Sequence, residues 1–201
     1  MGTSDQPTAE AAATLILGSS SPRRRELLRQ VGVVFRICVF PVDERVLPGE
    51  APADYVLRVA RDKALEVMRQ DASDLPVLAA DTAVVIDGEI LGKPDGPVEA
   101  AAMLARLSGR THEVYSAVAL ATRSGGLDDR LSVSRVSFAE LDATWIARYV
   151  DTGDPLDKAG AYGVQGRAAE KISRLEGSFS GVMGLPLFET CELLRDSEVL
   201  S

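Results

Sequence analysis

The sequence predicts an α/β protein with a mixed, twisted sheet flanked by helices. Helical and strand-like segments alternate in the first half of the chain, and two longer strand-like segments follow one another in the second half. The chain has 201 residues, 46% of them hydrophobic, which is enough to bury a sizeable core. No repeat or long linker divides it, so we expect one domain over residues 14–201, after a flexible tail over residues 1–13.

The first half of the chain predicts two strands and two helices in alternation. Residues 15–19 are mostly apolar and predict a buried strand. Ser21 is a favourable N-cap, and the proline after it suits the first helical position, so we expect a helix over residues 21–31. A second strand over residues 33–40 leads into a polar loop. Apolar residues at three- and four-residue spacing then predict an amphipathic helix over residues 54–68.

The middle of the chain predicts a short strand, a hairpin, a helix and two long strands. Residues 76–81, PVLAAD, form an apolar strand that ends at a carboxylate, and the Asp-Gly pair at 87–88 predicts a hairpin after it. Helical spacing over residues 97–107 ends at a Ser-Gly pair. Residues 111–122 and 130–140 are long strand-like segments joined by a glycine-containing turn.

The last part of the chain predicts a short helix over residues 142–150 and a final helix over residues 187–195, with a hairpin between them over residues 170–182. The intervening segment DTGDPLDKAGAYGVQG, at residues 151–166, is rich in glycine and irregular. Its last three glycines are three residues apart, so it is not a dinucleotide-binding fingerprint. Glycines nevertheless let a backbone come close to a ligand.

Charge and composition exclude several classes of protein. The net charge of −8 should repel nucleic acid, so no nucleic-acid partner is expected. Cys38 and Cys191 are expected to be free thiols, as in a reducing cytosol. Neither a signal peptide nor a run of about 20 apolar residues is present, which predicts a cytoplasmic protein outside the membrane. His112 is the only histidine, and without a G-x-S-x-G motif or zinc-ligand spacing it is not expected to be catalytic.

The stretch SSSPRRREL, residues 19–27, predicts an anion-binding site. Its three arginines fall in the first helical turn, where a cation opposes the helix dipole by about 0.3–1 kcal/mol. A bound phosphate would offset this cost and would also meet free backbone N–H groups and the hydroxyls of Ser19 and Ser21. We expect Arg23 and Arg24 to face the ligand and Arg25 to lie on the solvated side. The alternative is an exposed basic turn paired with surface carboxylates.

Five further polar residues are candidates for chemistry, each with a simpler alternative. Asp81, at the end of an apolar strand, suits a divalent-metal ligand or a general base, and otherwise a turn cap. Lys93 lies in GEILGKP, which fails the P-loop pattern but places an ammonium beside a tight turn. Gln165 is suited to hydrogen-bond the edge of a base. The simpler alternative for both Lys93 and Gln165 is a solvated loop residue without a chemical role. Glu44 and Lys63, taken alone, are solvated surface residues.

Taken together, these segments resemble the Maf family of nucleoside triphosphate pyrophosphatases. The matching motifs, in family order, are SSSPRRRELL, VARDKALEV, LAADTAVVIDGEILGKP, LSGRTHEV, DPLDKAGAYGVQG and GLPL. The resemblance implies a fold like that of inosine triphosphate pyrophosphatases, and a homodimer. It also implies hydrolysis of a nucleoside triphosphate between its α- and β-phosphates with the help of a divalent cation, Mg²⁺ or Mn²⁺.

The resemblance also implies roles for particular residues. Arg23, Thr82 and Gln165 stand where the branch that prefers dTTP and UTP carries its marker residues, and Thr82 and Gln165 are then expected to contact the pyrimidine. Asp81 corresponds to the proton acceptor of the family, with Glu44, Lys63 and Lys93 as further active-site residues. We expect Glu44 and Asp81 to hold the metal.

Three other functions stay open at this stage. One is a preference for 7-methyl-GTP, the substrate of the family's other branch, or for modified nucleotides. Another is a nucleotide-binding regulator of cell division that does not turn its ligand over. The third, nucleic-acid binding, is disfavoured by the negative net charge.

Overall fold

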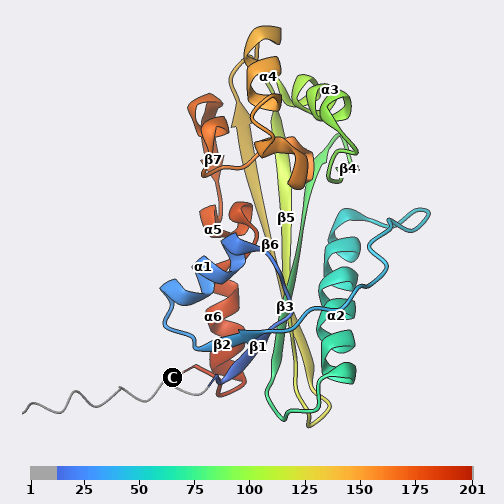
Figure 1. Cartoon of the computed structure of the whole chain (residues 1–201), viewed down its shortest axis with the longest axis vertical. Coiled ribbons are helices and arrows are strands. Elements are labelled where there is room, and N and C mark those ends of the chain that lie inside the picture. Colours follow the sequence, from blue (N-terminus) through green and yellow to red (C-terminus); the bar gives the residue numbers. More distant parts are fainter. Residues whose placement is uncertain (1–12, 201) are drawn as a thin grey trace, which may run out of the picture.

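The computed structural model describes residues 13–200, and its centre is a mixed sheet of seven strands (Figure 1). The strands are β1 (Leu15–Leu17), β2 (Phe35–Ile37), β3 (Val77–Ile86), β4 (Glu89–Leu91), β5 (Thr111–Ala121), β6 (Leu127–Phe138) and β7 (Ile172–Glu176). Their order across the sheet is β2-β1-β3-β5-β6-β7, with β4 beside β3. β1 runs parallel to β2 and β3, and the remaining pairs are antiparallel. The predicted fold class is confirmed.

The edge of β3 that faces β1 is only partly covered. β1 pairs with β3 at Val77 and Leu78, and β4 pairs with it from Val84 to Ile86. Between these two stretches, no strand within residues 13–200 pairs with that edge, although β5 pairs with the opposite edge throughout. Residues 79–83 therefore have no described strand beside them on that edge, and Asp81, Thr82 and Ala83 line a cleft there.

This continuity of β3 corrects the prediction that a strand ends at Asp81. Asp81 is the fifth residue of a ten-residue strand, opposite Ala117 of β5. An isolated carboxylate after four apolar residues resembled a strand end, but the apolar residues after Thr82 pair with β5 as well. The hairpin predicted next is confirmed: Asp87 (φ 54°) and Gly88 (φ 78°) form the turn between β3 and β4 with positive φ angles.

Helices cover both faces of the sheet (Figure 1). They are α1 (Pro22–Gln30), α2 (Pro52–Gln70), α3 (Pro97–Leu107), α4 (Ala143–Val150), α5 (Phe179–Met183) and α6 (Leu187–Asp196). Helix α2 packs on one face, where alanines at 60 and 64 meet alanines of β3 and β5 and allow close approach. Helices α1, α5 and α6 pack on the other face, on leucines of β1 and β3. Helices α3 and α4 enclose a third apolar cluster at the far end of the sheet.

The helices predicted over residues 21–31, 54–68, 97–107, 142–150 and 187–195 are confirmed to within two residues at each end. The hairpin predicted over residues 170–182 is wrong. β7 pairs with β6, and Ser178 then caps α5 by accepting a hydrogen bond from the Gly181 N–H at 2.9 Å. The predicted tail lies outside the described residues, apart from Ala13. Among residues 13–200, no helix has the length and the apolar character needed to cross a membrane.

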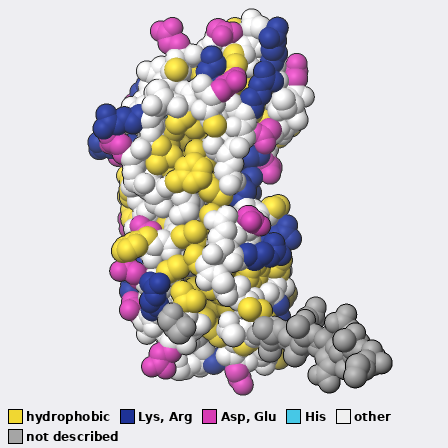
Figure 2. All heavy atoms as spheres, turned by 90° about the vertical axis from the view of Figure 1, so that its left-hand side faces the viewer, with side chains coloured by type: hydrophobic (Ala, Val, Ile, Leu, Met, Phe, Trp, Pro, Cys, Tyr) yellow, Lys and Arg dark blue, Asp and Glu magenta, His cyan; other side chains and the backbone are white. Residues whose placement is uncertain are grey.

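The glycine-rich segment contains two short 3₁₀ turns, η1 (Asp154–Asp157) and η2 (Ala159–Ala161), and a third, η3 (Arg167–Lys171), follows it. On another side of the molecule, where α5 and α6 lie, hydrophobic side chains gather in a band (Figure 2). Phe179 of α5 and Phe188 of α6 are 52% and 71% exposed. Apolar surface is therefore left uncovered on these two helices.

Candidate active site

One cleft of about 1000 Å³ collects every site residue predicted from the sequence. The predicted residues that line it are Ser19, Ser21, Arg23, Arg24, Glu44, Lys63, Asp81, Thr82, Lys93 and Gln165. Its floor is the uncovered part of β3, and its sides come from the start of α1, the loop before α2, the segment after β4 and the glycine-rich loop. The cleft thus lies at the gap between β1 and β4.

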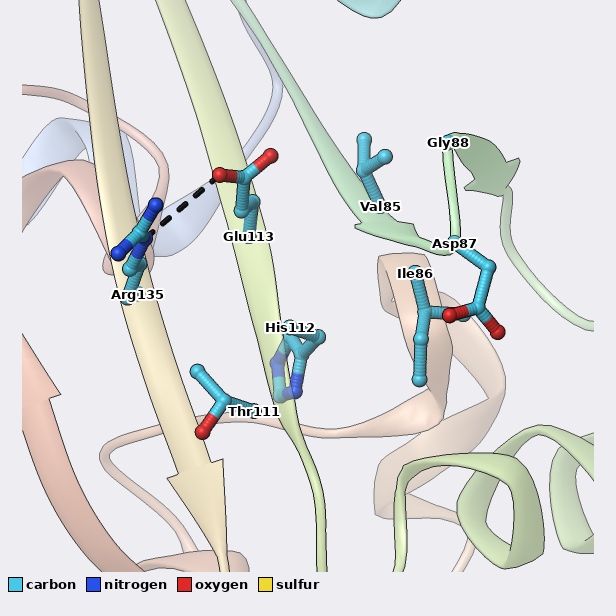
Figure 3. Close-up of a pocket in the computed structure, with 8 residues that line it drawn as sticks. All are labelled: Val85, Ile86, Asp87, Gly88, Thr111, His112, Glu113 and Arg135. Carbon is cyan, nitrogen blue, oxygen red and sulfur yellow. Dashed lines mark ion pairs between the residues drawn. The ribbon is translucent and has the colours of Figure 1, made fainter.

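A second pocket, of about 370 Å³, lies at the turn end of β3 and the start of β5 (Figure 3). Its charged groups are already paired. Glu113 and Arg135 face each other from neighbouring strands at 3.7 Å, and Asp87 forms an ion pair with Arg110 at 2.6 Å. None of the predicted site residues lines this pocket, so the large cleft is the candidate active site.

The mouth of α1 has the local structure that the sequence predicts. Ser21 is the N-cap, and its Oγ accepts a long hydrogen bond, 3.5 Å, from the Arg24 N–H. The Ser19 Oγ accepts from the Ser21 N–H at 3.3 Å and from the Arg24 Nη1 at 3.3 Å. The first turn contains no acidic residue. Backbone N–H groups, hydroxyls and guanidinium groups therefore converge at one helix end, where anions are favoured.

Arg24 is held by neutral groups alone. Its Nε donates to the carbonyl of Gly184 at 2.7 Å, and its Nη2 donates to the Thr82 Oγ1 at 3.4 Å. Within residues 13–200, no carboxylate forms an ion pair with it. Burial lowers the pKa of Arg24 from its usual value, and the nearby charge of Asp81 opposes this shift. A desolvated cation without a counter-ion is an electrostatic reason for this cleft to take up an anion.

The other two arginines of α1 differ in their surroundings. Arg23 lines the cleft and lies 4.0 Å from the Asp157 carboxylate of η1, so it reaches toward the glycine-rich loop. Arg25 does not line the cleft. Its side chain is partly buried rather than fully solvated, and its Nε has no hydrogen-bond partner among residues 13–200.

Asp81, Lys63 and Glu44 form one charged group. The Lys63 ammonium, from α2, lies 2.8 Å from the Asp81 Oδ1 and 3.0 Å from the Glu44 Oε1. The Asp81 side chain is only 8% exposed, whereas that of Glu44 is 48% exposed. Successive residues of a strand point to opposite faces, so Asp81 faces α2 while Thr82 faces α1 and α5. Residues that are distant in sequence are thereby brought to one carboxylate.

These residues fit a divalent cation that also binds phosphate oxygens. The carboxylates of Asp81 and Glu44 converge on one ammonium, so a cation of higher charge would meet both oxygens in the same region. No group of three or more His, Cys, Asp or Glu side chains suited to a metal exists among residues 13–200. Magnesium is commonly held by one or two carboxylates together with substrate phosphates and water, which matches this donor set.

Lys93 and Gln165 are exposed at the edge of the cleft opposite α1. Lys93 follows the β3–β4 hairpin, and Gln165 follows η2. The backbone before Gln165 is tightly placed. Gly160 has φ +65°, donates to the Gly92 carbonyl at 3.0 Å, and lies so close to Val84 that a Cβ would come within 2.8 Å of it. The Gln165 amide is therefore presented by a firmly anchored loop.

Several residues of the cleft were not found by sequence reasoning. The Tyr55 hydroxyl donates to the Glu44 carbonyl at 3.0 Å and so fixes the loop before α2. Burial, together with the charges of Asp81 and Glu44, raises the pKa of Tyr55 to about 12, which keeps the hydroxyl protonated. Lys158 lies 3.0 Å from Asp154 and 2.6 Å from Asp157. In the motif DPLDKAG, the sequence alone points to the glycines and to the later Gln165, and it gives no signal for Lys158.

His112 contacts the glycine-rich segment from the core side. Its Nε2 lies 2.7 Å from the Tyr162 hydroxyl, and the two rings make an edge contact at 5.4 Å. Burial lowers the pKa of His112 to about 4, so the ring is neutral near pH 7. The contact anchors Tyr162 to β5 through a neutral ring.

Fold and cleft together define an α/β protein in which a helix N-terminus with arginines and a buried carboxylate line the same cleft. Residues 14–197 match the family model described as Maf-like protein, and the chain belongs to this family. The family expected from the motifs is thereby confirmed.

Two curated relatives and one solved structure are similar to this chain over most of its length. A Methylobacillus flagellatus protein named dTTP/UTP pyrophosphatase is 56% identical over 92% of this chain and 93% of its own length. A Bordetella avium protein of the same name is 53% identical over 90% of this chain and 94% of its own length. The Staphylococcus aureus Ham1 protein matches with a TM-score of 0.51 and 12% identity, over 92% of this chain and 97% of that one, which is a likeness of fold alone.

Proposed function

We propose that this protein hydrolyses dTTP and UTP to the nucleoside monophosphate and pyrophosphate. Its curated relatives bear that name at 53–56% identity over nearly their whole length. The observation that carries the proposal is Arg24, a partly buried guanidinium with only neutral hydrogen-bond partners, in the same cleft as the buried carboxylate of Asp81. A polyanion supplies the missing counter-charge, and the carboxylate supplies a proton acceptor next to it.

Binding of the triphosphate is assigned to the mouth of α1 and the lysine opposite. Backbone N–H groups after Ser19, the side chains of Arg23 and Arg24, and the ammonium of Lys93 surround the cleft with positive charge. Phosphoryl transfer chemistry depends mainly on such positioning and charge neutralisation. The same groups stabilise the charge that accumulates on the leaving pyrophosphate.

Asp81 accepts the proton of the attacking water. Lys63 engages the Oδ1 of Asp81 at 2.8 Å, which keeps the carboxylate oriented and leaves its Oδ2 for the proton. Water oxygen bonds to the α-phosphorus while the bond to the bridging oxygen of the β-phosphate breaks. A divalent cation, Mg²⁺ or Mn²⁺, held by Asp81 and Glu44 together with phosphate oxygens, would supply Lewis-acid stabilisation of the phosphates.

Selectivity for thymine and uracil is assigned to Gln165. Its amide has both a donor and an acceptor, which matches the alternating carbonyl and imide N–H groups of these bases. A base with a different pattern would leave one of these groups unpaired, which costs affinity. The resemblance further supports a cytoplasmic homodimer as the working form.

The test is a panel of nucleoside triphosphates with Mg²⁺ or Mn²⁺, in which pyrophosphate and orthophosphate are measured separately. We expect pyrophosphate from dTTP and UTP, and loss of activity when the metal is chelated. Orthophosphate as the first product, or a preference for 7-methyl-GTP, would contradict the assignment. Tight nucleotide binding without turnover in any metal would favour the regulatory alternative.

A further inference from the structure

The loop between β2 and α2, which carries Glu44 to the cleft, is not anchored by apolar burial. Residues 43–49 are all exposed, and the apolar side chains of Val46 and Leu47 are 47% and 48% exposed. The Glu44 carboxylate nevertheless lies 3.0 Å from the Lys63 ammonium, although 48% of its own side chain is exposed. The backbone that carries this carboxylate therefore needs anchors of another kind.

Three successive carbonyls of this loop accept hydrogen bonds from helix α2. The Arg58 Nη1 donates to the Asp43 carbonyl at 3.4 Å, and its Nη2 donates to the Arg45 carbonyl at 2.9 Å. The Tyr55 hydroxyl donates to the carbonyl of Glu44, between these two, at 3.0 Å. Tyr55 and Arg58 are three residues apart on the helix, and the guanidinium lies 5.7 Å from the centre of the tyrosine ring. The two donors thus hold the backbone at Glu44 and on both sides of it.

Glu50 fixes the plane of the Arg58 guanidinium. Its Oε1 accepts from the Arg58 Nε at 2.6 Å and its Oε2 accepts from Nη2 at 2.9 Å, which is the two-pronged geometry of a strong pair. The Glu50 side chain is 8% exposed, and its Oε2 also accepts from the Leu47 N–H at 2.9 Å. These bonds from Arg58 lower the pKa of Glu50 to about 2, so the carboxylate is ionised in neutral buffer. Neither Arg58 nor Glu50 lines the cleft, so neither is placed to touch a ligand there.

We propose that Arg58, held by Glu50, is a positioning residue for Glu44. It keeps the loop backbone in one conformation, so that the exposed Glu44 carboxylate stays beside Lys63 in the absence of any ligand. A loop without this pair would have to be ordered each time a substrate binds, at a cost in conformational entropy. The place of one active-site carboxylate is thus set from outside the cleft. The inference deepens the proposed function and rests on it only where dTTP hydrolysis is measured.

The first test follows the loop itself and needs neither substrate nor metal. Trypsin cuts the native full-length protein after Arg45 only when the loop opens, so the rate of this cleavage reports how firmly the loop is held. Arg58→Lys keeps the positive charge, but its single nitrogen cannot form the two-pronged pair and also reach both carbonyls. We expect cleavage after Arg45 to be at least about threefold faster in this variant, and faster in Glu50→Gln as well.

Arg61→Lys is the matched control for the cleavage rate. Arg61 lies on the same helix, forms an ion pair with Asp129 at 2.6 Å and does not line the cleft. The same chemical change at this position should leave cleavage after Arg45 at the wild-type rate. A wild-type rate in Arg58→Lys, or an equal increase in the control, would overturn the proposal.

The second test asks whether the effect on turnover passes through Glu44. The value of kcat/KM for dTTP with Mg²⁺ is measured for Arg58→Lys in the wild-type and in the Glu44→Gln background. We expect a fall of about tenfold in the first, as loss of a charge-assisted hydrogen bond would cause. In the second the change should stay within about twofold, because the carboxylate to be positioned is already absent. Equal losses in both backgrounds would overturn the proposal and make Arg58 a residue that stabilises the fold in general.

Melting curves check that each variant is folded. If Arg58→Lys does not fold, Glu50→Gln replaces it in both tests, and a wild-type cleavage rate in Glu50→Gln then overturns the proposal. A wild-type protein that does not hydrolyse dTTP would contradict the proposed function, whereas the cleavage rates would still decide whether Arg58 holds the loop.

Discussion

Asp81→Asn is the substitution that most directly tests the chemistry. The amide has nearly the same size as the carboxylate and still offers an oxygen to Lys63, which lies 2.8 Å from the Asp81 Oδ1. Lys63 also keeps its ion pair with Glu44 at 3.0 Å, so the ammonium is not left without a counter-charge. The variant should therefore fold, while the acceptor for the proton of water is lost.

The expected loss follows from general-base catalysis. A positioned base contributes about 10²–10⁴ in rate, which corresponds to about 3–5 kcal/mol of transition-state stabilisation. The loss of stability should be far smaller. Replacing one member of a largely buried ion pair costs a few kcal/mol when its partner is stranded, and here the partner retains Glu44. Turnover should thus fall by at least a hundredfold with little change in melting temperature.

The measurement is pyrophosphate release at saturating dTTP, with thermal melts of the same samples. Asp129→Asn is a matched control, because Asp129 forms an ion pair with Arg61 of the same helix α2 at 2.6 Å, is 19% exposed and does not line the cleft. It makes the same chemical change outside the site and should leave turnover within about twofold of wild type. If Asp81→Asn retains more than a tenth of the activity, or the control loses as much, Asp81 is not the proton acceptor.

Three further results are expected. The low pKa of His112, about 4 against 6.5 when unfolded, means that the unfolded chain binds its proton first as the pH falls. This contribution to stability is fully present above pH 6.5 and declines by about 3 kcal/mol toward pH 4. The free energy of unfolding in urea, measured between these pH values, should therefore depend less on pH in His112→Phe than in the wild type. An equal pH dependence in both proteins would contradict this expectation. Gly160→Ala should lower the melting temperature and raise KM, because its Cβ would meet Val84 at 2.8 Å. Gly125→Ala is the control, because Gly125 also has a positive φ, +90°, but a Cβ there has no atom within 4 Å, so the substitution introduces backbone strain alone. An equal fall in melting temperature in the two variants would rule out the clash with Val84. Gln165→Ala should change the dTTP-to-GTP ratio without changing the melting temperature, since the side chain is exposed; an unchanged ratio would remove it from base selection.

The local structure at the start of α1 could be predicted because its signals are neighbours in the sequence. An N-cap serine, a proline at the first helical position and arginines in the first turn are neighbours in sequence, and the structure brings Ser21 and Arg24 together as expected. The contacts of Lys63 with Glu44 and Asp81 have no such local signal. The spacing of Lys63 and Glu44 to Asp81 says nothing about contact, and only the family resemblance predicted a shared site. Their meeting depends on α2 packing on the face of the sheet to which Asp81 points.

The errors also have physical causes. The sequence places the end of a strand at Asp81, because a central strand seldom carries a charge without a partner, and the partner, Lys63, is not recognisable from the sequence. The local turn signal around β7 predicts a hairpin, whereas the strand pairs with β6, more than thirty residues earlier in the chain. Long-range pairing overrides a local turn signal in such cases.

The chemistry of this cleft depends on the register of a single strand. Asp81 and Thr82 are adjacent, so β3 turns one side chain toward Lys63 and the next toward Arg24. A slip of one residue would exchange the two faces and place the hydroxyl against the ammonium and the carboxylate against the arginine. The pairing of β3 with β5, from Val77 opposite Ala121 to Val85 opposite Glu113, prevents this slip along the whole strand. The uncovered edge between β1 and β4 can therefore stay open for a ligand, because β5 still pairs with the opposite edge along this stretch.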